Sequence, residues 1–248
     1  MSFPAENAER DASRASPGTK LLSILRWERG PRVSHVVGLY LIAGVCGLVD
    51  AACFLALGEV FAEMMTGNLL LLSFDIGTFR PLIEHAVYLV ALGSFAAGAV
   101  TGGRIVRGAH GHTRLGFAVE WVFLALAVIL SLFLPPGSMG AMRDAIIALL
   151  AFAMGLQNAL LRRHGVPDLA TNVMTLTLTA LVADSVLSGG QNERWRRRAS
   201  SIGVFMACAV LGAALTKTVG PWAPMLVALI FFSVALTGLT RQDAPPPR

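Results

Sequence analysis

Residues 33–57 read VSHVVGLYLIAGVCGLVDAACFLAL, an apolar run whose one acidic residue is Asp50. A run of this length is typical of a transmembrane helix, which needs about 20 apolar residues to cross the hydrocarbon core. A carboxylate inside such a helix costs roughly 3 kcal/mol on insertion. The run therefore predicts a helical membrane protein, and it marks Asp50 as the first candidate functional residue.

The composition of the whole chain agrees with this class. Of the 248 residues, 55% are hydrophobic and 14% are charged, and the mean hydropathy is +0.66. A soluble domain carries roughly 25% charged residues. A soluble enzyme domain is therefore excluded, and the abundance of aliphatic residues excludes a disordered chain. The net charge of +5 comes largely from basic residues in short loops, which membrane topology explains without a nucleic-acid partner.

Six runs are long enough to cross the membrane, and two further stretches are ambiguous. The six expected spans are Val33–Leu57, His85–Ile105, Leu115–Leu134, Met142–Leu161, Ser200–Thr218 and Pro221–Leu239. The ambiguous stretches are 64–78, which is short and broken by polar residues, and 169–187, which is rich in Thr. Short apolar stretches of this kind favour re-entrant segments. We expect an all-α membrane protein with six spans and two re-entrant or broken helices.

The distribution of arginine and lysine arbitrates between topologies. If both ambiguous stretches cross, the basic loop residues divide evenly between the two sides. If both dip in and return, nine arginines lie on the cytoplasmic side, and only Arg80, Arg143 and Lys217 lie outside. The nine are Arg104, Arg107, Arg114, Arg162, Arg163, Arg194, Arg196, Arg197 and Arg198. The positive-inside rule favours the second topology, with both termini cytoplasmic. A single crossing stretch, which would separate the termini, is the remaining alternative.

The chain also resembles itself. Three sets of residues recur, the first two at offsets of 108 and 109 and the third at 114: Gly47-Leu48-Val49-Asp50-Ala51 with Gly155-Leu156-Gln157-Asn158-Ala159, Met65-Thr66 with Met174-Thr175, and Ser94 and Gly98 with Cys208 and Gly212. Each half then holds three crossings, so the second half is inverted relative to the first. Inverted repeats with broken helices are typical of transporters. An ancient duplication without a pathway is the alternative.

These repeats define the expected organisation of the chain. Membrane repeat 1 covers residues 33–134, and membrane repeat 2 covers residues 142–240. Residues 1–32 are polar, lack the apolar core of a signal peptide and are expected to form a disordered cytoplasmic tail. Residues 241–248 form the second cytoplasmic tail.

Two segments also resemble a known family. GLVDAACFLALGEVFAEMMTGNLLLL at 47–72 and AMGLQNALLRRHGVPDLATNVMTLTLTALVADS at 153–185 are similar to YoaK-like bacterial membrane proteins, a family of unknown function. The resemblance covers nearly the whole chain after residue 33 and implies a multi-span protein of the bacterial inner membrane. It supplies no substrate and no catalytic residue.

Asp50 and its repeat mate form the central candidate site. A small-residue stripe beside Asp50 lets a second helix approach closely, so the carboxylate is expected to face the bundle interior. Asn158, preceded by Gln157, occupies the matching place in the second half. A pair of one acid and one amide suits a site in which only the acid titrates. The structural alternative is that Asp50 only forms hydrogen bonds at a helix junction. The packing stripes are Ala43, Gly47 and Ala51, then Ala151, Gly155 and Ala159, with Gly98 and Gly102 in the second span.

The two dipping segments supply further candidates. Thr66, Gly67 and Asn68 read as a turn-like break whose polar groups could contact freed backbone or a solute. In the second segment one helical face is polar, and it is composed of Thr171, Thr175 and Thr179 with Asn172 beside them. Two interpretations of these Thr residues are open: they line a pathway, or each one hydrogen-bonds to the backbone of its own helix.

Three charged features are interpreted as peripheral. Glu120 is expected to reach the membrane interface beside Trp121, and Asp184 is expected to be solvated. The basic run 193–198 is expected to set topology and to contact lipid headgroups.

No catalytic motif, cofactor motif or metal-ligand spacing is evident, including at the three cysteines, Cys46, Cys53 and Cys208. We therefore predict a non-enzymatic small-solute transporter or channel with a polar site between inverted repeats, coupled to protons if Asp50 titrates. The expected partners are the lipid bilayer and a small polar solute or proton, and a homo-oligomer is compatible with the packing faces. The alternative is a membrane scaffold or partner subunit. An intramembrane enzyme is less favoured, because it requires a second acid or a nucleophile.

Overall fold

The computed structural model describes residues 33–108, 113–135, 137–138, 140–163, 174–192 and 194–240. Its helices are α3 (Val33–Ala56), α4 (Met65–Gly77), α5 (Leu82–Arg107), α6 (Thr113–Leu132), α7 (Ala141–Arg163), α8 (Met174–Ala183), α9 (Trp195–Thr218) and α10 (Trp222–Thr240), with a 3-10 turn η1 (Val186–Ser188). No strand occurs in these ranges, so the all-helical class is confirmed. The two expected tails, 1–32 and 241–248, lie outside the described residues.

The helices fall into two length classes. Five of those described, α3, α5, α6, α7 and α9, are long and apolar enough to cross a membrane. Helix α10 is apolar along its 19 residues. Helices α4 and α8 have 13 and 10 residues, fewer than the roughly 20 that a crossing needs.

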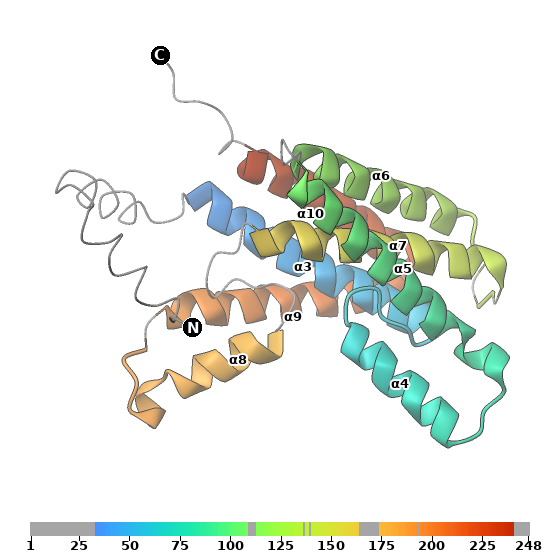
Figure 1. The fold of residues 1–248 in the computed structure, drawn as a ribbon, viewed down its shortest axis with the longest axis horizontal. Coiled ribbons are helices and arrows are strands. Elements are labelled where there is room, and N and C mark those ends of the chain that lie inside the picture. The colour runs from blue at the N-terminus through green and yellow to red at the C-terminus, as the bar shows by residue number, and fades with distance from the viewer. Residues whose placement is uncertain are drawn as a thin grey trace, which may run out of the picture.

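Helices α3 and α7 form the centre of the bundle and are its most buried long helices. Helix α3 packs against α9 and α10, and helix α7 packs against α5 and α6. Contacts between α6 and α10 close the bundle. The short helix α4 lies against α5 and the short helix α8 against α9, both on the same side of the bundle (Figure 1).

Glycines allow the central helices to approach their partners at backbone distance. A Cβ added at Gly47 would lie 2.6 Å from the Phe205 carbonyl oxygen of α9. A Cβ added at Gly155 would overlap the Phe95 carbonyl oxygen of α5. Both glycines belong to the predicted small-residue stripes, and a methyl group at either would force the helices apart.

The structure corrects two of the expected boundaries. Helix α9 begins at Trp195, five residues before the expected start, because the arginines that follow are good helix formers and continue the helix. The expected break at Thr66, Gly67 and Asn68 is wrong, since all three residues lie in the first turns of α4. The chain reverses earlier, over residues 57–64.

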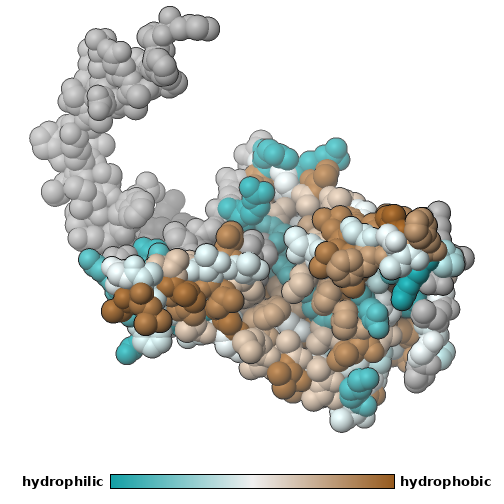
Figure 2. Space-filling model, turned by 90° about the horizontal axis from the view of Figure 1, so that it is seen from below, coloured by the Kyte–Doolittle hydropathy of each residue, from teal (hydrophilic) through white to brown (hydrophobic). Residues whose placement is uncertain are grey.

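The outward faces of the short helices are apolar. Figure 2 shows these side chains gathered over α4 and α8 on the face seen from below. On α4 they are Leu69, Leu70, Phe74 and Ile76, and on α8 they are Leu176, Leu178 and Val182. Exposed apolar area of this extent fits contact with lipid.

Candidate functional site

A tight turn after α3 brings the chain back onto Asp50. Gly58, with φ +102°, and Glu59, with φ +56°, adopt left-handed conformations that reverse the chain direction. The Asp50 carboxylate then accepts hydrogen bonds from the backbone N–H groups of three consecutive residues. The donors lie at 2.8 Å (Ala62), 2.9 Å (Glu63) and 3.3 Å (Met64). Asp50 is 4% exposed, so this acid fixes the backbone that leads into α4.

Asn68 holds the same turn from the other side. Its side-chain oxygen accepts from the Phe61 N–H at 2.9 Å, and its side-chain nitrogen donates to the Phe61 carbonyl at 2.7 Å. The Phe61 ring stacks on Phe54 of α3 with centroids 4.9 Å apart. The turn is therefore supported by one acid, one amide and one aromatic pair, which satisfy backbone groups that lipid could not.

The turn lines a cavity of about 490 Å³ beside the first residues of both short helices. Ligand sites of small molecules are typically about 300–1,000 Å³. The lining comes from α4, α5, α7, α8, α9 and the turn, and it consists of Glu63, Met64, Met65, Thr66, Phe95, Asn158, Met174, Thr175, Leu176 and Phe205. Two aromatic rings and several hydrogen-bonding groups thus face one space.

Glu63 is the ionisable group of this cavity. It lies outside the long helices. Burial, and then the nearby Asp50 carboxylate, raise the pKa of the Glu63 carboxyl above its usual range, whereas a hydrogen bond with the Asn158 side chain lowers it. Asp50 is engaged by three backbone N–H groups, whereas Glu63 is the acid of this pair that lines the cavity.

The predicted pair of Asp50 and Asn158 is joined through this residue. Asp50 accepts from the Glu63 N–H, and Asn158 bonds to the Glu63 carboxyl. Asn158 also donates to the Met154 carbonyl of its own helix at 2.8 Å. Gln157, in contrast, faces away from the cavity into the core, where its side chain is completely buried.

The polar residues of the short helices divide between lining and structural positions. Thr66 and Thr175 line the cavity, whereas Gly67 does not. Thr179 donates to the Thr175 carbonyl at 2.8 Å, which is back-bonding within α8. Thr171 and Asn172 lie outside the described residues.

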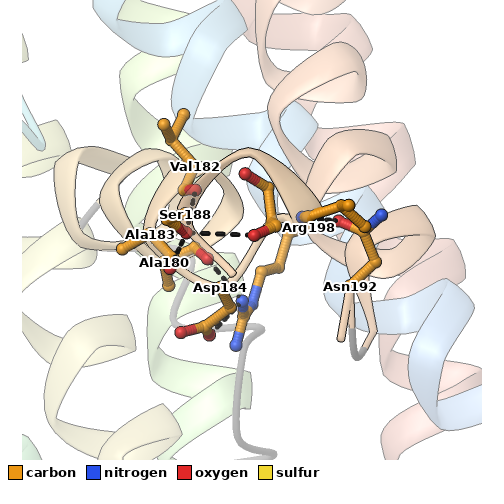
Figure 3. Close-up of polar contacts among 9 residues, drawn as sticks. Ala180, Val182, Ala183, Asp184, Ser188, Asn192 and Arg198 are labelled. Atoms are coloured by element: carbon orange, nitrogen blue, oxygen red, sulfur yellow. Dashed lines mark hydrogen bonds and ion pairs between the residues drawn. The ribbon is translucent and has the colours of Figure 1, made fainter. Parts of the chain in front are cut away.

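Acid–base contacts hold the far ends of both short helices. At α4, the Asp75 carboxylate contacts His85 Nδ1 at 3.3 Å and Arg80 at 3.5 Å, and His85 Nε2 lies 2.8 Å from the Arg80 carbonyl. At α8, Arg198 donates to the Asp184 carboxylate and to the Ala180 carbonyl, both at 2.6 Å (Figure 3). Each short helix is therefore tied to the long helix that follows it.

Asp184 is half-exposed, as expected, and it pairs with Arg198, whose side chain is buried although it belongs to the basic run. The expectation for Glu120 is wrong. Glu120 does not reach the interface and is completely buried.

Replacing Arg198 by alanine is expected to loosen α8. The substitution removes two charge-assisted hydrogen bonds, each worth roughly 1.5–3 kcal/mol, and leaves the Ala180 carbonyl without this donor. Hydrogen exchange followed by mass spectrometry should show faster exchange across Met174–Ala183. Arg196→Ala is the matched control, since Arg196 is exposed and lies over the Trp195 ring. Equal exchange in the two variants would contradict the assigned role.

Sequence reasoning missed Glu63, Asp75, His85 and the two cavity phenylalanines. A signal for some of them was present, because Asp75 and Asp184 stand at the same offset of 109 residues as the Met-Thr pairs. Glu63 directly precedes the MMTGN motif and could have been found as a second acid close to Asp50.

These helices define a multi-pass, all-helical membrane protein. The chain belongs to the family described as "Protein of unknown function (DUF1275)", whose model matches residues 38–237. It is 31% identical over 150 residues to the UPF0700 transmembrane protein YoaK of Bacillus subtilis (strain 168), a match that spans 59% of this chain and 65% of that protein. No solved structure matches. The resemblance to YoaK-like proteins is confirmed.

Proposed function

We propose that the protein is a small-solute transporter or channel of the bacterial inner membrane, and that the solute binds in the cavity between α4 and α8. The observation that carries the proposal is the lining itself: the first residues of two short helices, one from each half, face a space that also holds Glu63 and Asn158. Transporters place their sites at such discontinuous helices near the membrane midplane.

Six spans and two inverted repeats are part of the proposal. Exchanging α3 with α7, α4 with α8, α5 with α9 and α6 with α10 maps the packing of α3 on α9 and α10 onto the packing of α7 on α5 and α6. The pairs of α4 with α5 and α8 with α9 exchange in the same way. The cavity follows this symmetry, because Met65, Thr66 and Phe95 correspond to Met174, Thr175 and Phe205.

The contacts favour a different repeat alignment for the second span of each half. A Cβ at Gly102 would meet the Leu156 carbonyl and Ala159, and a Cβ at Gly212 would meet the Leu48 carbonyl and Ala51. This supports an offset of 110 residues in place of the 114 inferred from Gly98 and Gly212. Under the proposed symmetry, an offset of 114 would place Gly98 and Gly212 one helical turn out of register.

The short helices are proposed to be re-entrant. Each begins at the cavity, presents apolar side chains outward and ends at an acid–base contact with the long helix that follows it. Such a path enters the membrane and returns to the same side. With both termini cytoplasmic, reporter fusions at residues 80 and 190 are expected to lie on the outer and cytoplasmic sides, respectively.

A proton is proposed to move with the solute through Glu63, and no enzymatic step is proposed. Both oxygens of Asp50 are occupied by backbone donors, so this acid is not free to act with Glu63 as a catalytic pair. Glu63, which lines the cavity, therefore replaces Asp50, the residue predicted from the sequence, as the proposed site of proton coupling.

Flux measurements in liposomes test this assignment. Purified protein should be screened with small carboxylates, amines and uncharged polar solutes against a pH-sensitive dye trapped inside. Solute-dependent proton movement is expected with wild type and is expected to be lost in Glu63→Gln. Glu59→Gln is the matched control, because Glu59 is an exposed glutamate of the same turn. Equal proton movement in the two variants would overturn the role of Glu63.

The second candidate, a scaffold or partner subunit, is favoured by the outward faces of α5 and α9, which are the least buried of the long helices. A second copy or another membrane protein could pack there. Absence of flux for the whole panel, together with a stable oligomer in detergent, would support this reading against transport.

A further inference from the structure

Glu120 is a buried acid that the cavity does not use. It lies in the middle of α6, its side chain is fully enclosed, and neither carboxyl oxygen has a hydrogen-bond partner among the described residues. An isolated ionised carboxylate in such a place is very costly, and a group of this kind neutralises instead. The surroundings of Glu120 therefore decide what it does.

The packing of α6 on α7 sets those surroundings. A Cβ at Gly116 would meet the Leu160 side chain, and Phe123 stacks on Phe152 with ring centroids 4.4 Å apart. These two contacts define an antiparallel register. Glu120, midway between Gly116 and Phe123, lies at the level of residues 155–157 of α7.

Gln157, at this level of α7, also has a buried polar atom without a hydrogen-bond partner among the described residues. Its side-chain nitrogen donates to the Cys46 sulfur at 3.5 Å, but its side-chain oxygen is buried without a hydrogen-bond donor among the described residues. A carboxylate cannot supply the missing donor, whereas a neutral carboxylic acid has one O–H group. One proton on Glu120 would satisfy the acid and the amide together.

No described cation is positioned to neutralise an ionised Glu120. On the helices that pack against α6, the described basic side chains lie in the first or last turns, and the same holds for α6 itself: they are His85, Arg104 and Arg107 on α5, Arg114 on α6, and Arg143 and Arg162 on α7. Residues 222–240 of α10 contain no ionisable side chain.

We propose that Glu120 and Gln157 form a buried proton-binding site, in which the neutral acid of Glu120 donates its proton to the side-chain oxygen of Gln157. The site lies behind the cavity, because Gln157 directly precedes the cavity residue Asn158 on α7. A metal ion is a poorer occupant, since three oxygens and one thiol fall short of the six or more oxygen ligands that hard cations take. The site does not depend on solute transport.

Infrared spectroscopy of the full chain in lipid nanodiscs tests the proposal. At neutral pH, the wild type is expected to show a carbonyl band of a protonated carboxyl group that is lost in Glu120→Gln and retained in the control Glu59→Gln. Gln157→Leu removes the hydrogen bond and is expected to shift the same band to higher frequency. Loss of a carboxylate band in Glu120→Gln, or no spectral difference from wild type, would overturn the proposal. An unchanged band in Gln157→Leu would exclude the pairing.

Discussion

Asp50→Ala is expected to open the turn at residues 57–64 and to destabilise the protein by about 3 kcal/mol, because three backbone N–H groups lose a charged acceptor in a largely buried place. The native thiols report this opening directly. Cys46 and Cys53 flank Asp50 on α3 and are completely buried. A membrane-permeant thiol reagent should modify them about 100-fold faster in the variant, which is the factor that 3 kcal/mol gives for a local opening equilibrium.

Asp144→Ala is the matched control for this experiment. Asp144 pairs with its neighbour Arg143 at 2.8 Å and is partly exposed, and pairs near the surface contribute roughly 0–1 kcal/mol. Asp50→Asn should fall between the two, because an amide oxygen can still accept while the amide nitrogen faces another donor. Labelling rates in Asp50→Ala no higher than in Asp144→Ala would show that the turn does not depend on the carboxylate.

The long helices could be predicted from the sequence because length and apolar composition suffice. The run at 33–57 became α3, Val33–Ala56, with a one-residue difference at its end. The close approach of the helices was also readable, because small residues four apart have that one common use in membranes. Both inferences depend only on residue types along a single segment.

The turn at residues 57–64 could not be predicted in the same way. The donors to Asp50 are backbone N–H groups 12 to 14 residues away, and every residue except proline carries such a group, so side-chain types leave no trace of the contact. Gly67 and Asn68 suggested a break in the chain, but both residues are helical. The Asn68 side chain instead bonds to Phe61 and supports the turn that lies before the helix.

The prediction that Glu120 reaches the membrane interface was wrong for a geometric reason. The span was expected to start at Leu115, so Glu120 was expected to lie near the N-terminal end of the helix. Helix α6 begins at Thr113, and packing on α7 covers the face that carries Glu120. Depth in a bundle depends on the neighbouring helix as much as on distance from the helix end.

Gly98→Ala is expected to be the most disruptive single-methyl change in α5. A Cβ at this position would overlap the Phe152 carbonyl oxygen of α7, and the next nearest atom that it would meet beyond that carbonyl is the Leu156 nitrogen at 3.0 Å. Backbone atoms of a packed helix cannot move aside singly, so the two helices must separate. Overpacking of this kind costs about 3 kcal/mol, and we expect a clear fall in the thermal unfolding temperature in detergent.

Gly93→Ala is the control that separates packing from helix propensity. Both glycines lie on α5, but a Cβ at Gly93 would meet no atom within 4 Å. Alanine there gains helix propensity and should stabilise by up to about 1 kcal/mol. The two substitutions add the same methyl group to the same helix, so the difference in their effects measures the contact alone. Gly155→Ala should match Gly98→Ala, because its Cβ would overlap the Phe95 carbonyl across the same interface. If all three variants unfold at the same temperature, α5 and α7 do not meet at backbone distance, and the cavity bounded by Phe95 and Asn158 loses its support.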